Sequence, residues 1–352
     1  MGRDKPGMYM PIFTYYHPMV TRLSNIAALR ESILHIPLAR RPEEFFAREQ
    51  LVRAVHASTA LEGNPLSRAD VGKIAAGVEV SASERDTTEV KNYLRVLEHI
   101  ESYQTDGSIT VEDLLALHRD ITQGTLDNPK DVGAFRKVKI EAGNRITKLG
   151  VYPVPLPKYV VPETNRIVNW LNSTEPGMMH PILVAGIAHY ELMHIYPFTE
   201  GNGRTARALA TLILAKKEFD PRRFFTLDDL YNQDHPAYFG ALRGKDQKYP
   251  ELTGWLDYFT TGAEISLHRL KEQVLMLYAD DHLEAPSGQA LLSKHQTEII
   301  DFIKTNGSIH TSDLVSRYHI QRYTAVMVLT EMVDRGLIQR REIRRGMNYV
   351  LI

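Results

Sequence analysis

The chain of 352 residues is 43% hydrophobic and 24% charged, and its formal net charge is −1. This balance is typical of a globular protein and excludes a general electrostatic attraction to nucleic acid or to an anionic membrane. The chain has no cysteine, which excludes disulfides and cysteine-ligated metals. With no signal-like N-terminus and no apolar run of about 18 residues, we expect a cytoplasmic protein without a membrane segment. The length predicts two or more domains.

The N-terminal region is predicted to begin as an irregular arm over residues 1–22, which are rich in Pro, Tyr and Met and lack a helical period. A helix is expected from Ser24 to about Leu38. A second helix is expected from Pro42 to about Ala60, because proline and acidic residues favour a helix start. Gly63 and Pro65 end it.

Short polar and amphipathic segments follow. They are predicted as a helix, a loop and a helix over residues 66–76, 81–88 and 89–100. Ser67 is a plausible N-cap for the first of these. Thr110, with Asp113 at the third helical position, is predicted to open a further helix that runs to about Thr122.

The helical pattern lapses before residue 152. Phe135, Val138 and Ile140 alternate with charged residues, as in a strand. A turn at residues 142–144 and a return over Ile146 to Val151 complete a predicted hairpin at about residues 135–152. This hairpin is either an ordinary surface feature or an edge that binds an extended peptide by adding a strand to it.

Three helices are expected next, over residues 158–172, 180–195 and 204–217. The second is the most apolar and should be central. His189 on this helix is expected to be a core histidine rather than a metal ligand, because no second ligand stands at metal-binding spacing.

A glycine turn, Gly201-Asn202-Gly203, leads into the third of these helices. Free backbone N–H groups at a helix start, together with the helix dipole, favour an anion. Arg204 and Arg207 share one face of the first turn, and the carboxylate of Glu200 could hold Mg²⁺ on a bound polyphosphate. The plainer alternative is a capping loop with two solvated arginines.

The segment from Asp228 to Leu242 is polar and then aromatic, and a long amphipathic helix is expected from Leu252 to about Tyr278. Pro286-Ser-Gly-Gln marks a boundary. Residues 290–352 are predicted to form three helices and two strands joined at Arg345-Gly346, which is the element set of a winged helix-turn-helix.

The predicted wing is basic. Its arginines are Arg340, Arg341, Arg344 and Arg345. A DNA backbone would suit this cluster. A winged helix used for protein contacts or dimerisation explains it equally well.

One longer segment carries a family resemblance: Pro197-Phe198-x-Glu200-Gly201-Asn202-Gly203-Arg204-x-x-Arg207. It resembles the motif of Fic proteins, which are largely adenylyltransferases that move AMP from ATP to a hydroxyl of a target protein. The resemblance implies a mainly α-helical fold with a short β-hairpin, the flap, that holds the target. It also implies that the nucleotide is bound by Thr199, Glu200, Gly201, Asn202, Gly203, Arg204 and Arg207, with Mg²⁺ on Glu200.

The match departs from the family motif at one position. An ungapped alignment places Tyr196 where the family has its catalytic histidine, which takes the proton from the attacking hydroxyl. A tyrosine titrates near ~10 in peptides and is therefore a poor base at neutral pH. His194, two residues upstream, is the substitute. In a helix the two side chains would point to different sides, and in an extended segment to the same side.

Two further resemblances concern regulation and the adenine. Ser58 and Glu62 match the family's inhibitory motif, in which the glutamate pairs with the second arginine of the Fic motif, here Arg207. In isolation, Glu62 would be a solvated residue at a helix end. The family also places an aromatic residue near the adenine, and Tyr231 and Tyr238 are the candidates, unless they are core aromatics.

These observations predict three regions: an N-terminal helical extension with the inhibitory motif (1–88), a Fic core (89–284) and a winged-helix domain (290–352). The first hypothesis is a self-inhibited adenylyltransferase that uses ATP and Mg²⁺. The second is a catalytically impaired nucleotide-binding regulator that acts through its winged helix on DNA or a protein partner. A homodimer is possible under either hypothesis.

Overall fold

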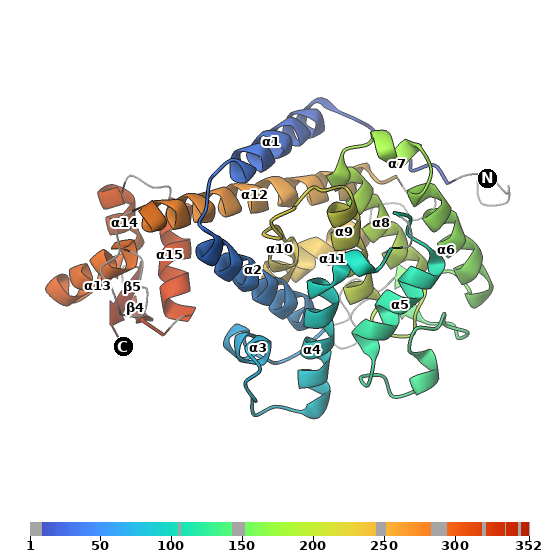
Figure 1. Ribbon diagram of the computed structural model, residues 1–352, viewed down its shortest axis with the longest axis horizontal. Coiled ribbons are helices and arrows are strands. Elements are labelled where there is room, and N and C mark those ends of the chain that lie inside the picture. The colour runs from blue at the N-terminus through green and yellow to red at the C-terminus, as the bar shows by residue number, and fades with distance from the viewer. Residues whose placement is uncertain are drawn as a thin grey trace. The chain divides into compact units, whose positions relative to one another are not determined.

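The computed structural model is mainly helical (Figure 1). It describes residues 9–104, 107–142, 152–243, 251–282, 294–318, 322–334, 336–343 and 346–351. Contacts divide the chain into two units, Met1–His35 with Glu43–His268, and Ile36–Pro42 with Arg269–Ile352. The division into regions 1–88, 89–284 and 290–352 stays a prediction. No helix in the described ranges combines the length and the apolar character needed to cross a membrane.

The first helices along the chain are α1 (His17–Leu34), α2 (Arg40–Ala60), α3 (Arg68–Ala75) and α4 (Glu84–Glu98). The predicted irregular arm was wrong over its last six residues, because α1 already begins at His17. Pro18 stands in the first turn, where a missing N–H costs nothing. Met19 and Leu23 are buried and anchor this early start.

The predicted loop at residues 81–88 was wrong in its second half. The side chain of Ser83 accepts a hydrogen bond from the backbone N–H of Asp86 at 3.0 Å, so that α4 is capped and begins at Glu84. The same device caps α3, where Ser67 accepts from the N–H of Asp70 at 3.2 Å. A serine N-cap therefore sets the first residue of both α3 and α4. The cap at Ser83 was not predicted, because it lies in a polar stretch that resembles a loop.

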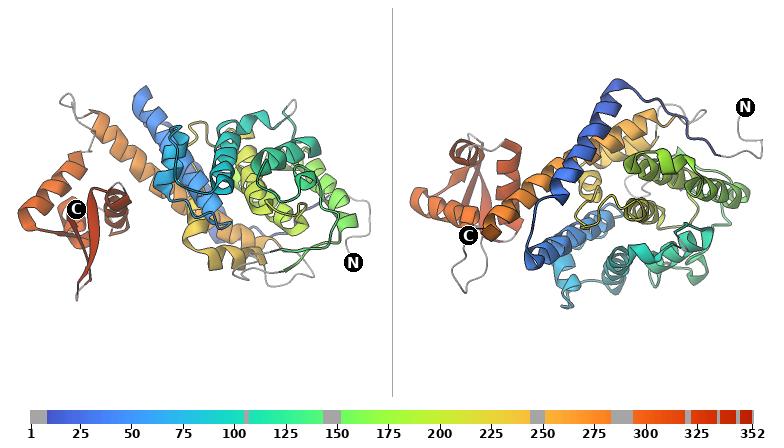
Figure 2. Two further views of the ribbon diagram at one scale, coloured as in Figure 1. Left: turned by 90° about the horizontal axis from the view of Figure 1, so that it is seen from below. Right: turned by 45° about the horizontal axis from the view of Figure 1, so that its top comes forward.

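The centre of the first unit is formed by α8 and α9. The elements in this part of the chain are the 3₁₀ turns η1 (Ile100–Ser102) and η2 (Pro129–Asp131) and the helices α5 (Val111–Thr122), α6 (Pro157–Leu171), α7 (Glu175–Met178), α8 (Pro181–Ile195) and α9 (Asn202–Lys216). Nearly every residue of α8 is buried, as its composition predicted. Helix α9 packs against α8, α4 and α5 (Figures 1 and 2).

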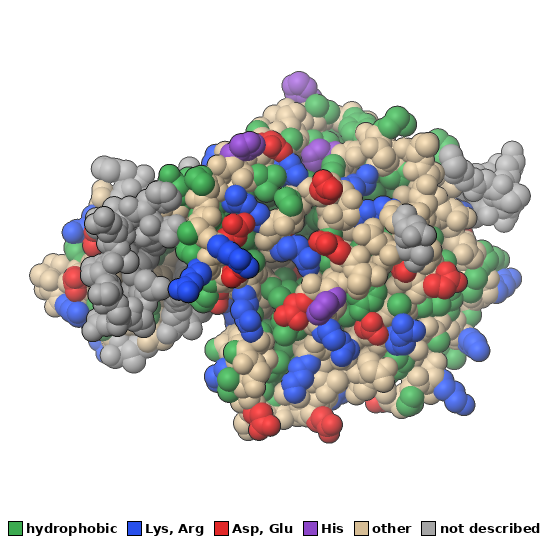
Figure 3. All heavy atoms as spheres, in the orientation of Figure 1, with side chains coloured by type: hydrophobic (Ala, Val, Ile, Leu, Met, Phe, Trp, Pro, Cys, Tyr) green, Lys and Arg blue, Asp and Glu red, His purple; other side chains and the backbone are tan. Residues whose placement is uncertain are grey.

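The helices that complete the first unit are α10 (Asp228–Gln233), α11 (His235–Arg243) and α12 (Thr253–His282), of which the unit includes α12 up to His268. The indole N–H of Trp255 on α12 donates to the carbonyl of Gly186 on α8 at 2.7 Å. The absence of a side chain at Gly186 lets the aromatic residues of α12 approach α8 closely. Figure 3 shows basic and acidic side chains interspersed over the visible face of this unit.

The predicted hairpin is present but shorter than expected. Strands β1 (Glu141–Ala142) and β2 (Tyr152–Pro153) pair antiparallel. The expected strand over Phe135 to Ile140 was wrong, because that segment is irregular and Val138 is 54% exposed. The predicted turn at residues 142–144 was wrong at Ala142, which belongs to strand β1. The rest of the predicted turn and the return over Ile146 to Val151 lie outside the described residues.

The second unit contains α13 (Lys294–Asn306), β3 (Ile309–His310), α14 (Thr311–Tyr318), α15 (Arg322–Asp334), β4 (Ile338–Ile343) and β5 (Gly346–Leu351). The strand order is β3-β5-β4, and both pairings are antiparallel. Its own core includes Ile299, Ile303, Leu314, Leu329 and Ile338. Strand β3 was not anticipated from the sequence. The winged-helix assignment stays a prediction, and Arg344 and Arg345 lie outside the described residues.

Candidate functional site

The connection between α8 and α9 is a tight loop whose backbone leaves the helix sharply. Helix α8 ends at Ile195, and Tyr196 adopts the left-handed conformation with φ 49° and ψ 61°. Its N–H donates to the carbonyl of Leu192 at 2.9 Å, and Pro197 prevents the helix from continuing. A tyrosine in this region of backbone space is strained, so the surrounding contacts must hold it there.

Asn202 closes the loop with its side chain. The N–H of Phe198 donates to Oδ1 of Asn202 at 3.0 Å, and Nδ2 of Asn202 donates to the carbonyl of Phe198 at 2.8 Å. Gly201 has φ 77°, a value that favours glycine. Helix α9 therefore starts at Asn202, two residues before the predicted start, and no side chain caps its N-terminus. Its first N–H groups are left to bind an anion.

Arg207 is buried and is bound from two sides. Its Nη2 donates to Oε1 of Glu62 at 2.8 Å and to the carbonyl of Ser58 at 3.0 Å, while its Nε donates to Oγ of Ser58 at 2.7 Å. Oδ1 of Asp228 lies 3.2 Å from Nε and forms an ion pair with it. The structure thus brings Ser58, Glu62 and Arg207 together from segments far apart in sequence. Asp228 was missed, because only the fold places it there.

The charges of this cluster are unequal. Burial alone would lower the pKa of Arg207, but the carboxylates of Glu62 and Asp228 hold it above the ordinary value. Burial raises the pKa of Asp228, against the opposing pull of Arg207. One guanidinium therefore faces two carboxylates in a region of low polarity, and the cluster carries a net negative charge when all three groups are ionised.

Glu62 also covers the start of α9. A Cβ atom at Gly203 would collide with Oε1 of Glu62 and would lie 2.9 Å from Nη1 of Arg207. The carboxylate of Glu62 is therefore seated over the first turn of α9, beside the free N–H groups. The carboxylate of Glu62 thus occupies the start of α9, where the sequence predicted that the anion of a ligand would bind.

Arg204 is also buried and is matched to an acid. Its Nη1 lies 2.5 Å from Oε1 of Glu89 on α4, and Glu89 additionally accepts a hydrogen bond from Nδ2 of Asn64 at 2.7 Å. The Nε of Arg204 is buried and has no hydrogen-bond partner among the residues that the structure describes. A buried guanidinium N–H without an acceptor favours a further anionic ligand.

The remaining residues of the predicted phosphate site lie at its edge. The side chain of Glu200 is 42% exposed, and Oε2 lies 3.5 Å from Nη2 of Arg85. The hydroxyl of Thr199 donates to Oδ2 of Asp131 at 3.3 Å. In the described ranges, no group of three or more His, Asp or Glu side chains could hold a metal by itself. A metal at Glu200 would therefore take other ligands from a bound phosphate, as Mg²⁺ commonly does.

The two candidate bases are separated by the end of the helix. His194 lies in the last turn of α8, where its Nδ1 is 2.8 Å from the carbonyl of Tyr190. Its ring stacks on that of Tyr190 with centroids 3.8 Å apart. A carbonyl only accepts, so Nδ1 carries the proton and Nε2 is the nitrogen that can take one. His194 is helical, but Tyr196 follows the helix in the left-handed conformation, so the pair fits neither the helical nor the extended alternative. Which of the two residues acts as the base stays a prediction.

Arg136 connects the loop to the hairpin and was not identified from the sequence. Its Nε donates to the carbonyl of Tyr196 at 2.6 Å, and its Nη2 donates to that of Pro155 at 2.6 Å. Its Nη1 donates to the carbonyl of Val138 at 3.1 Å. A single buried guanidinium thereby binds the carbonyl of Tyr196, whose backbone is strained, and the carbonyls of one residue before β1 and one residue after β2.

His118 supports the loop from α5 and was also missed. Its Nδ1 accepts from the N–H of Gly133 at 3.1 Å, so Nε2 carries the proton and donates to the carbonyl of Glu200 at 3.0 Å. The ring stacks on that of Phe198 with centroids 3.6 Å apart. Burial lowers the pKa of His118 to about 4, which keeps the ring neutral and preserves both hydrogen bonds.

The two tyrosines considered for adenine binding lie in an aromatic cluster. Tyr231 and Tyr238 are 2% and 0% exposed, and their rings stack with centroids 4.5 Å apart. The Tyr238 hydroxyl is 2.9 Å from Nε2 of His189. This packing agrees with the alternative that the two tyrosines are core aromatics. An adenine base could stack on either ring only after the cluster opened. Their adenine role stays a prediction.

The comparisons with known proteins agree with this geometry. Residues 108–214 match the sequence profile of the Fic/DOC family. The chain is 30% identical over 229 residues to protein adenylyltransferase Fic of Nematostella vectensis, which covers 63% of this chain and 51% of that protein. It is 32% identical over 228 residues to protein adenylyltransferase fic-1 of Caenorhabditis elegans, which covers 63% of this chain and 43% of that protein. The match spans about half the length of these relatives.

Solved structures show the same fold. A Fic family protein from Desulfovibrio desulfuricans has a TM-score of 0.65 at 22% identity and covers 98% of both chains. Residues 134–508 of Fic-1 from C. elegans have a TM-score of 0.60 at 27% identity, over 73% of this chain and 72% of that one. With the loop of Asn202 and its arginines in place, these matches show that residues 108–214 form a domain of the Fic/DOC family.

Proposed function

We propose that this protein transfers AMP from ATP to a hydroxyl side chain of a target protein, and that Glu62 restrains the reaction. The observation that carries the proposal is the double contact of Glu62, which pairs with Arg207 at 2.8 Å and also covers Gly203 at the start of α9. A nucleotide phosphate needs the same guanidinium and the same N–H groups, so the carboxylate and the phosphate compete. The relatives that share the Fic/DOC domain are named protein adenylyltransferases.

The phosphates would be held by the N-terminus of α9 and by Arg204 and Arg207. The unpartnered Nε of Arg204 supports this placement, because it is a buried donor in the first turn of α9. Mg²⁺ would be held by Glu200 together with phosphate oxygens. Glu200 would first have to give up its ion pair with Arg85. The metal would neutralise phosphate charge at the site.

The transfer forms a bond between the target's hydroxyl oxygen and the α-phosphorus of ATP and breaks the bond to pyrophosphate, which leaves. The hydroxyl proton must go to a base. Tyr196 stands at the motif position for this role, and Nε2 of His194 is the substitute. The target segment would lie along the β1–β2 hairpin, whose short strands could pair with an extended peptide.

A second candidate is a nucleotide-binding regulator without transfer activity, and it is favoured by the tyrosine at position 196. In this case nucleotide binding would alter the contacts of the second unit with DNA or with a protein, including a second copy of the chain. Arg340 and Arg341 on β4 are exposed and could contact a DNA backbone. Salt-sensitive DNA binding that weakens in a variant with both arginines replaced by glutamine would support this role.

Labelled ATP separates the two candidates. The protein and its Glu62→Gly variant are incubated with ATP labelled in the α-phosphate and Mg²⁺, and incorporation into protein is measured. Label that appears in the Glu62→Gly variant and is lost on adding Tyr196→Phe or His194→Ala supports transfer and identifies the base. Measurable ATP binding with no incorporation in any variant overturns the transfer proposal and supports the regulator.

A further inference from the structure

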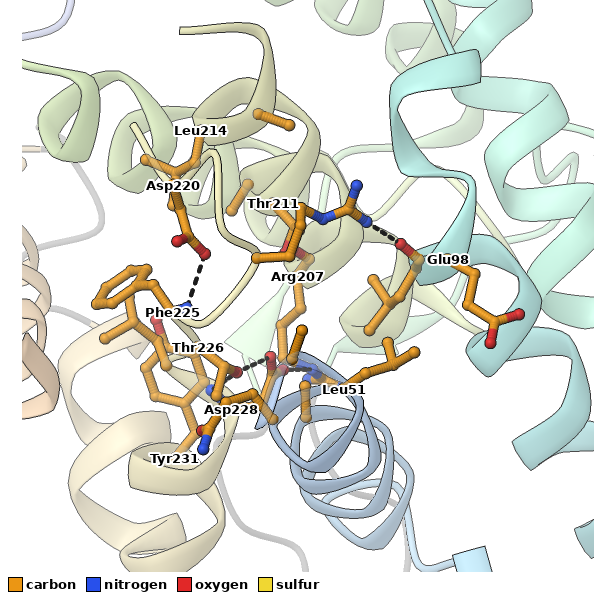
Figure 4. A pocket seen from close by; sticks show the side chains of 18 of the residues that line it. Leu51, Glu98, Arg207, Thr211, Leu214, Asp220, Phe225, Thr226, Asp228 and Tyr231 are labelled. Atoms are coloured by element: carbon orange, nitrogen blue, oxygen red, sulfur yellow. Dashed lines mark hydrogen bonds and ion pairs between the residues drawn. The ribbon is translucent and has the colours of Figure 1, made fainter. Parts of the chain in front are cut away.

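A separate cavity of about 380 Å³ lies between α2, the C-terminal half of α9 and the segment that leads into α10 (Figure 4). Helix α2 contributes Leu51 and Ala54 to its wall, and α9 contributes Arg207 and Leu214. None of residues 196–204 is part of the described lining. The cavity therefore lies behind Arg207, on the side away from the start of α9, and its volume is in the range of small-molecule sites.

Three buried residues of the cavity lining each carry a polar side-chain atom that has no hydrogen-bond partner among the described residues. Nδ1 of His189, Oη of Tyr231 and Oδ1 of Asp228 have no hydrogen-bond partner among the described residues, although Oδ1 is ion-paired with Arg207. All three residues line the cavity, and their exposed fractions are 0%, 2% and 6%. Buried polar atoms are nearly always hydrogen-bonded in native proteins, so three of them on one cavity indicate a missing polar ligand.

The chemistry of these atoms selects the ligand. A carboxylate oxygen and a tyrosine oxygen accept hydrogen bonds, and the neutral ring of His189 accepts at Nδ1 when its Nε2 proton points to Tyr238. Burial keeps the pKa of His189 well below its ordinary value. A primary ammonium has three N–H donors for these three acceptors. A positive charge would also compensate the excess of Glu62 and Asp228 over Arg207.

A large part of the wall is apolar and aromatic, and this part includes Leu51, Leu97, Leu214, Phe225, Leu227 and Phe259. The charged residues of the lining besides Arg207 and Asp228 are the acids Glu44, Glu98 and Asp220 and the arginines Arg48 and Arg223. Such a wall would bury the body of an amphipathic ligand, and an ammonium beside Tyr231 gains from the aromatic ring as well. We propose that this cavity binds a small organic cation, a primary amine on an apolar or aromatic body, with its ammonium group on Asp228.

The position of the cavity gives the ligand a regulatory effect, and this part rests on the proposed function. Ala54 and Ser58 are four residues apart on α2 and share one face, so the wall of the cavity continues into the residues that hold Arg207. The cavity exists in the arrangement in which Glu62 is paired. A ligand that needs α2 as a wall stabilises that arrangement and opposes phosphate binding.

Three matched probes test the site on the full chain: tryptamine, tryptophol and indole-3-acetate, which differ in carrying an amine, a neutral hydroxyl and a carboxylate. Ligand-observed NMR and calorimetry should show tryptamine binding about tenfold or more tightly than tryptophol, with no binding of indole-3-acetate. Equal affinity for all three, or no binding of tryptamine, overturns the proposal.

Two variants locate the probe. Asp228→Asn keeps the size of the side chain and should abolish the preference for tryptamine over tryptophol. Ala47→Trp, which places a large ring in the cavity wall from α2 and leaves Arg207 and Asp228 unsubstituted, should abolish binding of both, while Phe45→Trp on the exposed part of α2 leaves binding unchanged. Retained binding in the folded Ala47→Trp protein would place the ligand elsewhere and contradict the proposal.

The regulatory part has its own measurement. ATP and tryptamine should weaken each other's affinity by the same factor, because thermodynamic coupling is reciprocal. Tryptamine binding without ATP binding would leave the amine site standing and overturn the proposed function. Transfer of AMP from ATP without tryptamine binding would support the proposed function and overturn the amine site. If ATP and tryptamine both bind but do not change each other's affinity, the coupling is overturned.

Discussion

The carboxylate of Glu62 occupies the space in which a side chain at Gly203 would have to lie. Glu62 follows the end of α2, and Gly203 lies in the first turn of α9. A side chain at position 203 would have to displace the carboxylate of Glu62. Glu62 therefore acts on the first turn of α9 as well as on Arg207. One side chain therefore covers both of the elements that we propose to bind phosphate.

Removal of this carboxylate should expose both elements at once. We expect Glu62→Gln to raise the affinity for Mg²⁺-ATP roughly tenfold, because a charged hydrogen bond of about 1.5–3 kcal/mol no longer competes for Arg207. Glu62→Gly should raise it further by vacating the space over Gly203. Calorimetric titration with ATP measures both effects.

Glu49 provides the matched control, on the helix α2 that precedes Glu62. It forms a more exposed ion pair with Arg68 at 3.3 Å, and such pairs contribute little. Glu49→Gln should leave ATP affinity unchanged. Equal affinities for the wild type and both Glu62 variants would mean that the carboxylate does not compete with the nucleotide.

The motif position at residue 196 allows a gain of activity. We expect Tyr196→His, introduced into the Glu62→Gly variant, to raise AMP transfer by about 100-fold or more, because general-base catalysis contributes on that scale. Label incorporation at fixed ATP concentration measures the change. Tyr196→Phe is the control, since it keeps the ring and removes the ionisable group. If the histidine variant transfers no faster than the phenylalanine variant, the proton is taken elsewhere.

The sequence predicted those parts of the site that local rules can describe. The start of α9 followed from the glycine turn, and the meeting of Glu62 with Arg207 followed from two motifs. Asp228 and Glu89 could not be found in this way, because each reaches its arginine from a separate helix through the fold alone. Local sequence rules predict helices and turns, whereas ion pairs between helices can be predicted only when the packing of the helices is known.

The missed backbone features have a similar cause. The left-handed conformation of Tyr196 is unexpected for a bulky residue. It is held by Arg136, 60 residues earlier in the chain, whose Nε donates to the Tyr196 carbonyl. The alternation at Phe135 to Ile140 predicted a strand, but the segment instead supplies that arginine and the Val138 carbonyl that it binds. A tertiary contact thus overrode a local pattern.

His118 should make the stability of the first unit sensitive to acid. Its pKa is about 4 in the folded protein and about 6.5 in an unfolded chain. Below pH 6.5 the unfolded chain binds a proton that the folded chain does not, so stability is complete above pH 6.5 and falls as the pH drops toward 4. This residue alone should lower the free energy of unfolding by about 2 kcal/mol between pH 7 and pH 5.

Urea denaturation at both pH values tests this expectation. His118→Gln should be less stable at pH 7, because the hydrogen bonds to Gly133 and Glu200 are lost, and should show a smaller loss between the two pH values. Burial also lowers the pKa of His180 to about 4. The free energy of unfolding of the double variant His118→Gln/His180→Gln should therefore depend on pH even less than that of the single variant. An unchanged slope in the single variant would show that His118 titrates alike in both states.

Arg136 should control both the hairpin and the backbone at Tyr196. Its guanidinium donates to carbonyls from the segments before β1, after β2 and after α8, and its own N–H donates to the Pro197 carbonyl at 2.9 Å. A lysine has one nitrogen and cannot reach all of these acceptors. Arg136→Lys leaves at least two partly buried carbonyls without their present donor, so we expect a loss of roughly 2 kcal/mol in the free energy of unfolding.

Hydrogen exchange distinguishes this role from a general loss of stability. In Arg136→Lys, the amides near β1, β2 and Tyr196 should exchange much faster, while those of α8 away from its end change only as far as global stability requires. Arg243→Lys, at the exposed end of α11, controls for the chemical change and should alter neither quantity. If exchange rises uniformly instead, Arg136 stabilises the fold without specifically holding the loop. If the backbone at Tyr196 is released as expected, AMP transfer by the Tyr196→His/Glu62→Gly protein should fall when Arg136→Lys is added, because the base would no longer be held in place.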